Sequence, residues 1–318
     1  MEDFPIKNWI PYELKNQDGV WLCNWLNSFE KPFTKPFFDE TILDLKSEHA
    51  AISFTSSSNL AMMKEWAGGI TAITPSTFIF HTSRCGSTLI SQLLSTSNKH
   101  IVVPEVPFFD NLLRLPYQDK NFSEQEILNL LSASIKYYGQ VRTGREQRLY
   151  IKTDSWHIFF YHQLRKLYPT VPFILMYRNP AEIFNSLKKI PGLQSVQGLI
   201  EPAVFGFQLK EIVYPDTYIS MVLEAYLRQY LTIIEQDNCF LLLNYNEGPM
   251  PMIKKIVDFT NIPLSNTDTA IMTERSYYHS KKPAEVFSET MPPYIPGCLN
   301  KAMELYYQLE EKRSCTRI

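Results

Sequence analysis

The chain lacks any long apolar run. None of its 318 residues lies in a stretch approaching the roughly 20 consecutive apolar residues that span a bilayer. Its N-terminal Met-Glu-Asp-Phe-Pro lacks the basic head and apolar run of a signal peptide. The five cysteines are scattered without the spacing of metal ligands, which is typical of proteins from a reducing compartment. We therefore expect a cytoplasmic protein with no membrane span.

An excess of charge of one sign is also missing. The chain has 31 basic and 33 acidic residues, so it carries no global electrostatic footprint for a nucleic acid. We expect no nucleic-acid partner, and any anion must be bound by a local pocket.

The common nucleotide-binding loop of ATPases and GTPases is absent too. No segment matches G-x-x-x-x-G-K-[ST], in which backbone N–H groups and the lysine hold the phosphates. This absence argues against an ATPase or a GTPase. The chain also contains no internal repeat and no low-complexity linker.

The pattern of apolar residues predicts two parts. Residues 1–75 are rich in aromatics and prolines, and we expect a mostly helical N-terminal extension that packs on a main domain, residues 76–318. In the main domain, short apolar runs typical of buried parallel strands alternate with helical patterns. The strand-like runs are Phe78–Phe80, Ile101–Val103, Leu149–Ile151, Phe173–Tyr177 and Phe240–Leu243. The helical runs are 86–96, 123–138, 155–167, 181–189 and 217–236. This alternation predicts an α/β fold with a doubly wound parallel sheet flanked by helices.

The turn after the first strand has the chemistry of an anion site. Ser83–Gly86 lead from the strand into a helix that carries Ser87 and Thr88. Backbone N–H groups at such a turn lie at the positive end of the helix dipole and suit a phosphate or sulfate. Arg84 adds a positive charge. The alternative is a plain strand–turn–helix with Ser and Thr near the helix start.

Polar residues also follow the second and third strands. Glu105 is a candidate general base, since ligands of doubly wound sheets bind beyond the carboxyl ends of the strands. Lys152 would balance the negative charge that develops on a leaving oxygen. Asp154 and His157 are rival candidates for the base. Each of these residues could instead be an ordinary solvated loop residue.

A second anion-binding element is predicted after the fourth strand. Arg178 ends this strand, and Ser186 lies eight residues later, about two turns into the next helix. The two side chains could share one anion. Two separate anion-binding elements on one sheet imply a ligand with two phosphate or sulfate groups.

These residues resemble the sulfotransferases that use 3′-phosphoadenosine-5′-phosphosulfate (PAPS). In that family a [KR]-S-G-[ST]-[ST] loop holds the 5′-phosphosulfate, and an Arg with a Ser eight residues later holds the 3′-phosphate. The residues that match the loop are Arg84, Cys85, Gly86, Ser87 and Thr88, with Cys85 in place of the usual Ser, and Arg178 and Ser186 match the second element. The resemblance covers roughly residues 78–285 and implies the P-loop NTPase-like sulfotransferase fold, with 3′,5′-ADP as the product and no metal.

Within this family, the placement of the motifs is most similar to that of the protein-tyrosine sulfotransferases. Glu105 stands where they carry a catalytic Glu, and Lys152 matches their Lys. Ser276 and Lys282 resemble their C-terminal segment that closes over the cofactor. Cytosolic sulfotransferases place a His two residues after the Lys, but this chain has Asp154 there, so Glu105 leads as the base.

The resemblance implies an enzyme that moves the sulfuryl group of PAPS to a hydroxyl or an amine of an acceptor. The absence of a signal peptide argues against the role of the tyrosine-sulfating enzymes, so we expect a small-molecule acceptor. Glu105, Lys152 and Arg84 are its expected catalytic residues. The aromatic N-terminal extension and residues 106–122 and 190–216 are expected to shape the acceptor pocket. Two alternatives stay open, a P-loop small-molecule kinase and a non-catalytic nucleotide-binding member of the fold.

Overall fold

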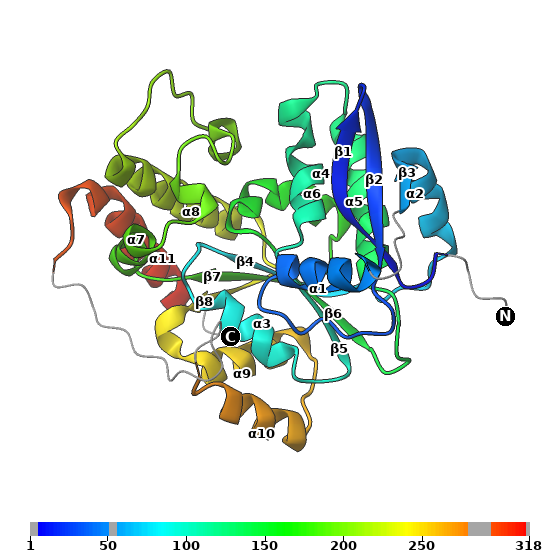
Figure 1. The fold of residues 1–318 in the computed structure, drawn as a ribbon. Coiled ribbons are helices and arrows are strands. Elements are labelled where there is room, and N and C mark those ends of the chain that lie inside the picture. The colour runs from blue at the N-terminus through cyan, green and yellow to red at the C-terminus, as the bar shows by residue number, and fades with distance from the viewer. Residues whose placement is uncertain (1–5, 51–55, 279–293, 316–318) are drawn as a thin grey trace.

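The computed structural model describes residues 6–50, 56–278 and 294–315. Its centre is a parallel sheet of five strands in the order β5-β6-β4-β7-β8 (Figure 1). The strands are β4 (Pro75–His81), β5 (His100–Pro104), β6 (Arg148–Lys152), β7 (Phe173–Tyr177) and β8 (Phe240–Asn244). Each contains one of the five predicted apolar runs, so the predicted parallel sheet is confirmed.

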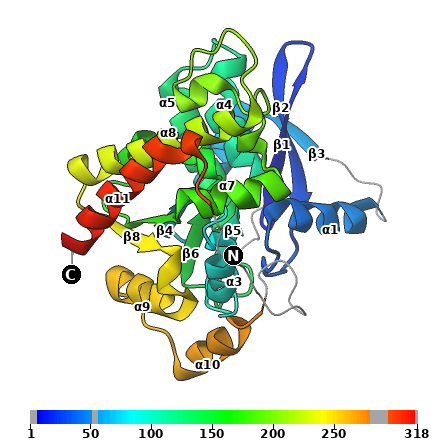
Figure 2. The same cartoon turned by 90° about the vertical axis from the view of Figure 1, so that its left-hand side faces the viewer.

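Side chains alternate along these strands and build a separate apolar layer on each face of the sheet. Phe78 and Phe80 of β4 join the larger core, while Ile79 between them joins the smaller one. The larger core includes α4 (Pro107–Gln118), α5 (Glu124–Tyr138), α6 (Tyr161–Leu167), α7 (Pro180–Lys189), α8 (Pro215–Gln236) and α11 (Asn300–Cys315). The smaller core includes α3 (Ser87–Leu94), α9 (Pro249–Thr260) and α10 (Asn266–Arg275). Figure 2 shows α11 lying along α7 and α8.

The predicted helical runs are confirmed with small shifts at their ends. Ser123 and Glu126 form the capping box that starts α5. Residues 155–167 divide into a 3₁₀ helix, Ser155–Phe160, followed by α6. Four further short 3₁₀ helices lie in the described part of this domain, at Leu193–Ser195, Pro202–Phe205, Tyr245–Glu247 and Gly297–Leu299.

The N-terminal segment differs from its prediction. Its described residues contain a three-stranded antiparallel sheet, β1 (Trp9–Gln17), β2 (Val20–Asn27) and β3 (Ser56–Asn59). The same residues contain only two α-helices, α1 (Phe38–Ala50) and α2 (Leu60–Trp66), and a 3₁₀ turn at Ala67–Gly69 follows α2. The expectation of a mostly helical extension is therefore wrong. Asp18 and Gly19, both with positive φ, form the two-residue loop between β1 and β2. An Asp-Gly pair between apolar alternating segments is the strongest local signal of a hairpin.

The N-terminal sheet packs on α5. Trp25 of β2 is buried and lies edge-on to Tyr137, with ring centroids 4.8 Å apart. The Tyr138 hydroxyl donates to the Pro11 carbonyl, and Gln140 donates to the Trp9 carbonyl over 3.0 Å. Figure 1 shows this sheet standing beside α4 and α5.

The strand order fixes where a ligand can approach. β4 pairs with β6 on one side and with β7 on the other. The connection that follows β4 therefore leads to one half of the sheet, and the connection that follows β6 leads to the other half. Such a switch point opens a crevice at the carboxyl end of the central strand. Residues that follow β4, β5, β6, β7 and β8 therefore meet at one edge.

Candidate active site

The loop after β4 has an unusual backbone. Ser83, Arg84 and Gly86 have φ of 65°, 48° and 79°, all in the left-handed region. Left-handed non-glycine residues cost about 1–3 kcal/mol each and cluster at ligand-binding sites. At Gly86 a Cβ would lie 2.8 Å from the Tyr245 ring, so the loop requires glycine there for space as well as for φ.

The same loop opens α3. The first helical hydrogen bond runs from the Ile90 N–H to the Gly86 carbonyl, so the N–H groups of Thr88 and Leu89 have no partner within the helix. Cys85 points away from this edge, because its side chain is fully buried and donates to the Met176 carbonyl. Burial raises the pKa of the Cys85 thiol to about 11. Cys85 therefore belongs to the core and offers only its backbone to a ligand.

Arg84 and Ser83 contact the segment that follows α7. The Arg84 guanidinium donates to the Ile190 carbonyl over 2.7 Å, and Gln194 donates to the Ser83 hydroxyl over 2.8 Å. Burial lowers the pKa of Arg84, while the charge of Glu105 opposes this effect. Arg84 and Glu105 thus lie close enough to interact electrostatically.

The predicted second anion element also reaches the loop. Arg178 is buried, and its Nη1 donates to the Arg84 carbonyl over 3.2 Å. Its Nε donates to Glu182 over 2.7 Å, and its guanidinium lies 4.1 Å from the centre of the Tyr245 ring. Ser186 lies one turn beyond Glu182 on the same side of α7, and its hydroxyl has no hydrogen bond among the described residues. Arg178 therefore contacts the loop after β4 directly, in addition to its expected place in a second anion-binding element.

Glu105 and Lys152 meet at the carboxyl ends of β5 and β6. The Lys152 ammonium is fully buried and forms an ion pair with Glu105 Oε1, while the Glu105 side chain is 20% exposed. His81, the last residue of β4, places its Nε2 3.3 Å from the same oxygen. Burial alone would raise the pKa of Glu105, but Lys152 and His81 together hold it well below the usual range. Glu105 is therefore ionised, and no described residue hydrogen-bonds its Oε2.

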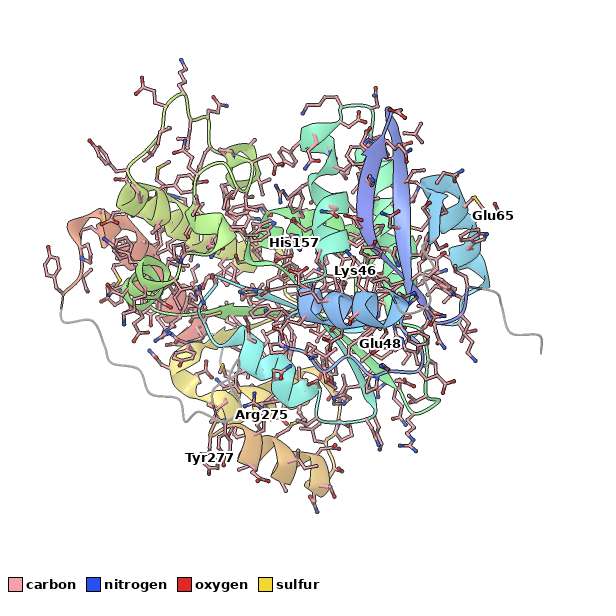
Figure 3. The ribbon with its side chains drawn as sticks, viewed as in Figure 1. Lys46, Glu48, Glu65, His157, Arg275 and Tyr277 are labelled. Carbon is pink, nitrogen blue, oxygen red and sulfur yellow. The ribbon has the colours of Figure 1, made fainter. Side chains whose placement is uncertain are left out.

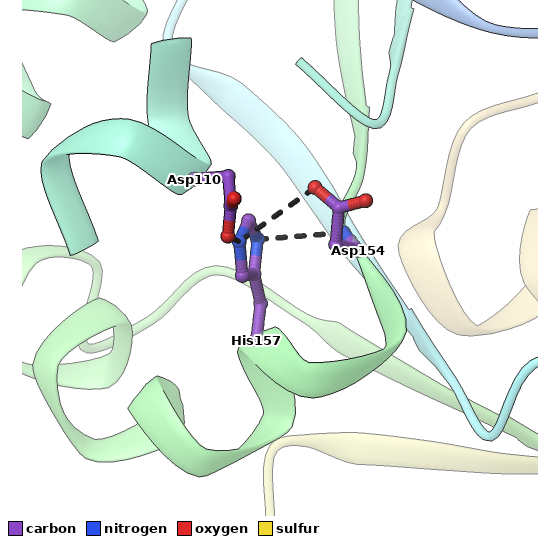
Figure 4. Close-up of side chains that lie close together, drawn as sticks. All are labelled: Asp110, Asp154 and His157. Atoms are coloured by element: carbon purple, nitrogen blue, oxygen red, sulfur yellow. Dashed lines mark hydrogen bonds and ion pairs between the residues drawn. The ribbon is translucent and has the colours of Figure 1, made fainter. Parts of the chain in front are cut away.

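Asp154 and His157, the rival bases, are arranged less favourably (Figure 4). Burial, with the charges of Glu105 and Asp110, raises the pKa of Asp154 well above its ordinary value. His157 Nε2 lies 3.0 Å from Asp110, and its Nδ1 accepts from the Asp154 N–H over 3.3 Å. Both ring nitrogens are thus occupied, and Asp154 favours its protonated form.

Asp110, Asp154 and His157 also have the proximity of metal ligands, with candidate atoms within 4.8 Å of one another. The Asp110 carboxylate, however, also accepts from the Trp156 indole over 2.5 Å and from Arg114 over 2.8 Å. Figure 3 shows His157 above the sheet. These hydrogen bonds connect α4 to the segment after β6. The cluster therefore has a structural role, holding these two elements together.

The N-terminal segment contributes to the same edge. The Phe37 ring centre lies 5.4 Å from the Lys152 ammonium. Partial burial and the charge of Glu105 raise the pKa of Asp39, at the start of α1. The Thr34 carbonyl accepts from Gln92 of α3 over 2.9 Å. The segment before the main domain therefore borders the site.

A sequence model of the sulfotransferase family matches residues 75–266. The match covers more than half of the chain and spans the strands that build the site. The chain belongs to the sulfotransferase family. No curated protein sequence matches it significantly.

Solved sulfotransferases have a similar fold. The sulfotransferase domain of the curacin biosynthetic pathway is 15% identical with a TM-score of 0.50, over 76% of this chain and 99% of that domain. The sulfotransferase domain of the Synechococcus PCC 7002 olefin synthase is 14% identical with a TM-score of 0.45, over 76% and 96%. Sulfotransferase STF9 from Mycobacterium avium is 16% identical with a TM-score of 0.43, over 65% and 69%. At this identity, the first of these supports the sulfotransferase fold alone.

Two residues expected to close over a cofactor lie near the C-terminus of the sulfotransferase chain. Ser276 follows α10, and its hydroxyl donates to the Thr273 carbonyl over 2.7 Å. Figure 3 shows its neighbours Arg275 and Tyr277 at the end of α10. Lys282 lies outside the described residues. In the described part of the chain, no helix is both long and apolar enough to cross a membrane.

Sequence reasoning missed four residues of the site. His81 directly follows the predicted strand Phe78–Phe80, and Tyr245 lies two residues after the predicted strand Phe240–Leu243. The rule that places chemistry at strand ends could therefore have found both. Phe37 and Asp39 come from the N-terminal segment, and no local pattern connects them to strand ends far along the chain.

Proposed function

We propose that the protein transfers the sulfuryl group of PAPS to a hydroxyl or an amine of a small-molecule acceptor. The observation that carries this proposal is the Glu105 carboxyl group with one oxygen held by Lys152 and His81, beside a left-handed loop of a sulfotransferase chain. We also propose that the chain divides into an N-terminal extension, residues 1–75, and a sulfotransferase-like domain, residues 76–318.

The loop residues fit the donor. Thr88 and Leu89 present N–H groups without helical partners, and Gly86 allows the left-handed turn against the Tyr245 ring that a Cβ would prevent. The Thr82 hydroxyl, at the start of the loop, is buried and has no hydrogen-bond partner among the described residues. We assign Arg84, Cys85, Gly86, Ser87 and Thr88 to the 5′ end of the donor, Cys85 through its backbone. Arg178 and Ser186 would hold the 3′-phosphate, with Ser276 and Lys282 closing over it.

The bound donor supplies the activated sulfuryl group, and the chain's residues position and neutralise charge. Glu105 Oε2 faces no described donor, so it would accept the proton of the acceptor's hydroxyl or amine. Lys152 and Arg84 would balance charge on the leaving oxygen, since such a transfer through a loose transition state depends mainly on positioning and electrostatics. Lys152 also keeps Glu105 ionised.

Binding of 3′,5′-ADP against ATP with Mg²⁺, measured by calorimetry on the full chain, tests the donor assignment. We expect 3′,5′-ADP to bind at least about tenfold more tightly, a difference of about 1.4 kcal/mol. Tighter binding of ATP with Mg²⁺ would favour a small-molecule kinase. Binding of 3′,5′-ADP without turnover over phenols, sterol-like alcohols, sugars and amines would favour a non-catalytic member.

A further inference from the structure

His81 makes contacts on both sides of its ring. It ends β4, directly before the left-handed loop, and is only 5% exposed. Its Nδ1 accepts a hydrogen bond from the Ser83 N–H over 3.1 Å. Its Nε2 lies 2.9 Å from the Thr153 carbonyl and 3.3 Å from Glu105 Oε1. One ring therefore joins the donor loop to the proposed base.

These contacts fix the tautomer of the ring. Because Nδ1 accepts from a backbone N–H, the proton of the neutral ring resides on Nε2. Burial lowers the pKa of His81, which favours the neutral form, although Glu105 opposes this effect. The Nε2–H is then shared between the Thr153 carbonyl and Glu105 Oε1.

Both Ser83 and Glu105, which the ring contacts, have a left-handed backbone. Ser83 has a φ of 65°, and its N–H is held by His81 at the start of the loop that carries Arg84. Glu105 has a φ of 51°, and its own N–H donates to the Lys152 carbonyl over 2.7 Å. Such left-handed conformations persist only where surrounding contacts hold them.

We propose that His81 is a positioning residue that aligns the donor loop with Glu105, through Nδ1 on the loop side and Nε2 on the base side. In this role His81 contacts neither PAPS nor the acceptor. Its Nε2–H turns Glu105 Oε1 toward Lys152 and leaves Oε2 for the acceptor, while its Nδ1 holds Ser83. This inference rests on the proposed function, because Glu105 serves there as the base.

Two substitutions separate the two sides of the ring. In His81→Asn the amide oxygen can take the place of Nδ1, so the Ser83 contact is kept and the Glu105 contact is lost. In His81→Gln the amide nitrogen can take the place of Nε2, so the Glu105 contact is kept and the Ser83 contact is lost. His100→Asn is the control, since His100 starts β5 at the opposite edge of the sheet.

The readouts are the Kd of 3′,5′-ADP by calorimetry, kcat with the best acceptor from the screen, and thermal unfolding of each variant. We expect His81→Asn to keep the wild-type Kd within about twofold and to lose kcat by about tenfold or more. We expect His81→Gln to weaken 3′,5′-ADP binding by about fivefold to tenfold and to keep kcat within about threefold. His100→Asn should change neither the Kd of 3′,5′-ADP nor kcat.

The opposite result has a clear form. Equal losses in both His81 variants, or no loss in either, would overturn the proposal and leave His81 a packing residue. Absence of 3′,5′-ADP binding by the wild-type protein would reject the proposed function and this inference with it. Normal wild-type binding and turnover without the split would reject the role of His81 alone.

Discussion

Removal of Glu105 should destabilise the protein, because it leaves the Lys152 ammonium without its counter-ion. The Lys152 side chain has no exposed area, and that of Glu105 is 20% exposed. Breaking a buried ion pair from one side costs about 3–5 kcal/mol. The Phe37 ring, 5.4 Å from the ammonium, can offset about 1 kcal/mol of this cost. We therefore expect Glu105→Ala to lower the free energy of unfolding by about 3 kcal/mol.

Two further variants separate charge from shape. Glu105→Gln keeps an oxygen that can accept from Lys152, so its loss should be about 1.5 kcal/mol. The double variant Glu105→Gln/Lys152→Met removes both charges and should lie within about 1 kcal/mol of wild type. Urea unfolding followed by circular dichroism at pH 7 gives all the values. A loss below about 0.5 kcal/mol for Glu105→Ala would refute the reasoning, because it would mean that the ion pair contributes no more than an exposed surface pair.

Other predictions follow from the same site. The pKa of Glu105 is held below its unfolded value, so its contribution to stability is present above about pH 4.3 and is lost on acidification. The free energy of unfolding in urea should therefore fall more steeply from pH 5 to pH 3 in wild type than in Glu105→Gln. Since burial and the charge of Glu105 raise the pKa of Asp154, its stabilising effect is present at low pH and is lost as pH rises, so Asp154→Asn should be more stable than wild type at pH 8 and not at pH 3.5. Gly86→Ala should abolish 3′,5′-ADP binding in calorimetry, whereas Gly144→Ala, with the same φ of 79° but open space around it, should bind normally. Arg178→Lys should weaken 3′,5′-ADP binding by about tenfold in the same assay, because a lysine cannot contact Glu182 and the Arg84 carbonyl at the same time, as the guanidinium does.

The sequence was sufficient to predict the five strands of the main sheet. These strands are buried on both faces, so each needs a continuous apolar run, which the local sequence shows directly, as in Phe173–Tyr177. The order of the strands depends on long-range pairing, and no local pattern encodes it. The hairpin at Asp18 and Gly19 was missed although its turn signal is local.

The site was predicted in part. Glu105 and Lys152 were each expected at the catalytic site because each follows a predicted parallel strand, and the structure joins them in an ion pair. The contact of Arg178 with the donor loop was not expected, since it depends on the close approach of β4 and β7 rather than on spacing. The double role of His81 depends on ring orientation, which a sequence does not contain.

The most direct test of the account is the formation of 3′,5′-ADP from PAPS in the presence of an acceptor. We expect wild-type protein to release 3′,5′-ADP only when an acceptor is present. We expect Glu105→Gln to bind 3′,5′-ADP normally while its turnover falls by about a hundredfold or more. Wild-type turnover in Glu105→Gln would contradict the assignment of the base, and the absence of acceptor-dependent release by wild type over the full acceptor screen would contradict the proposed reaction.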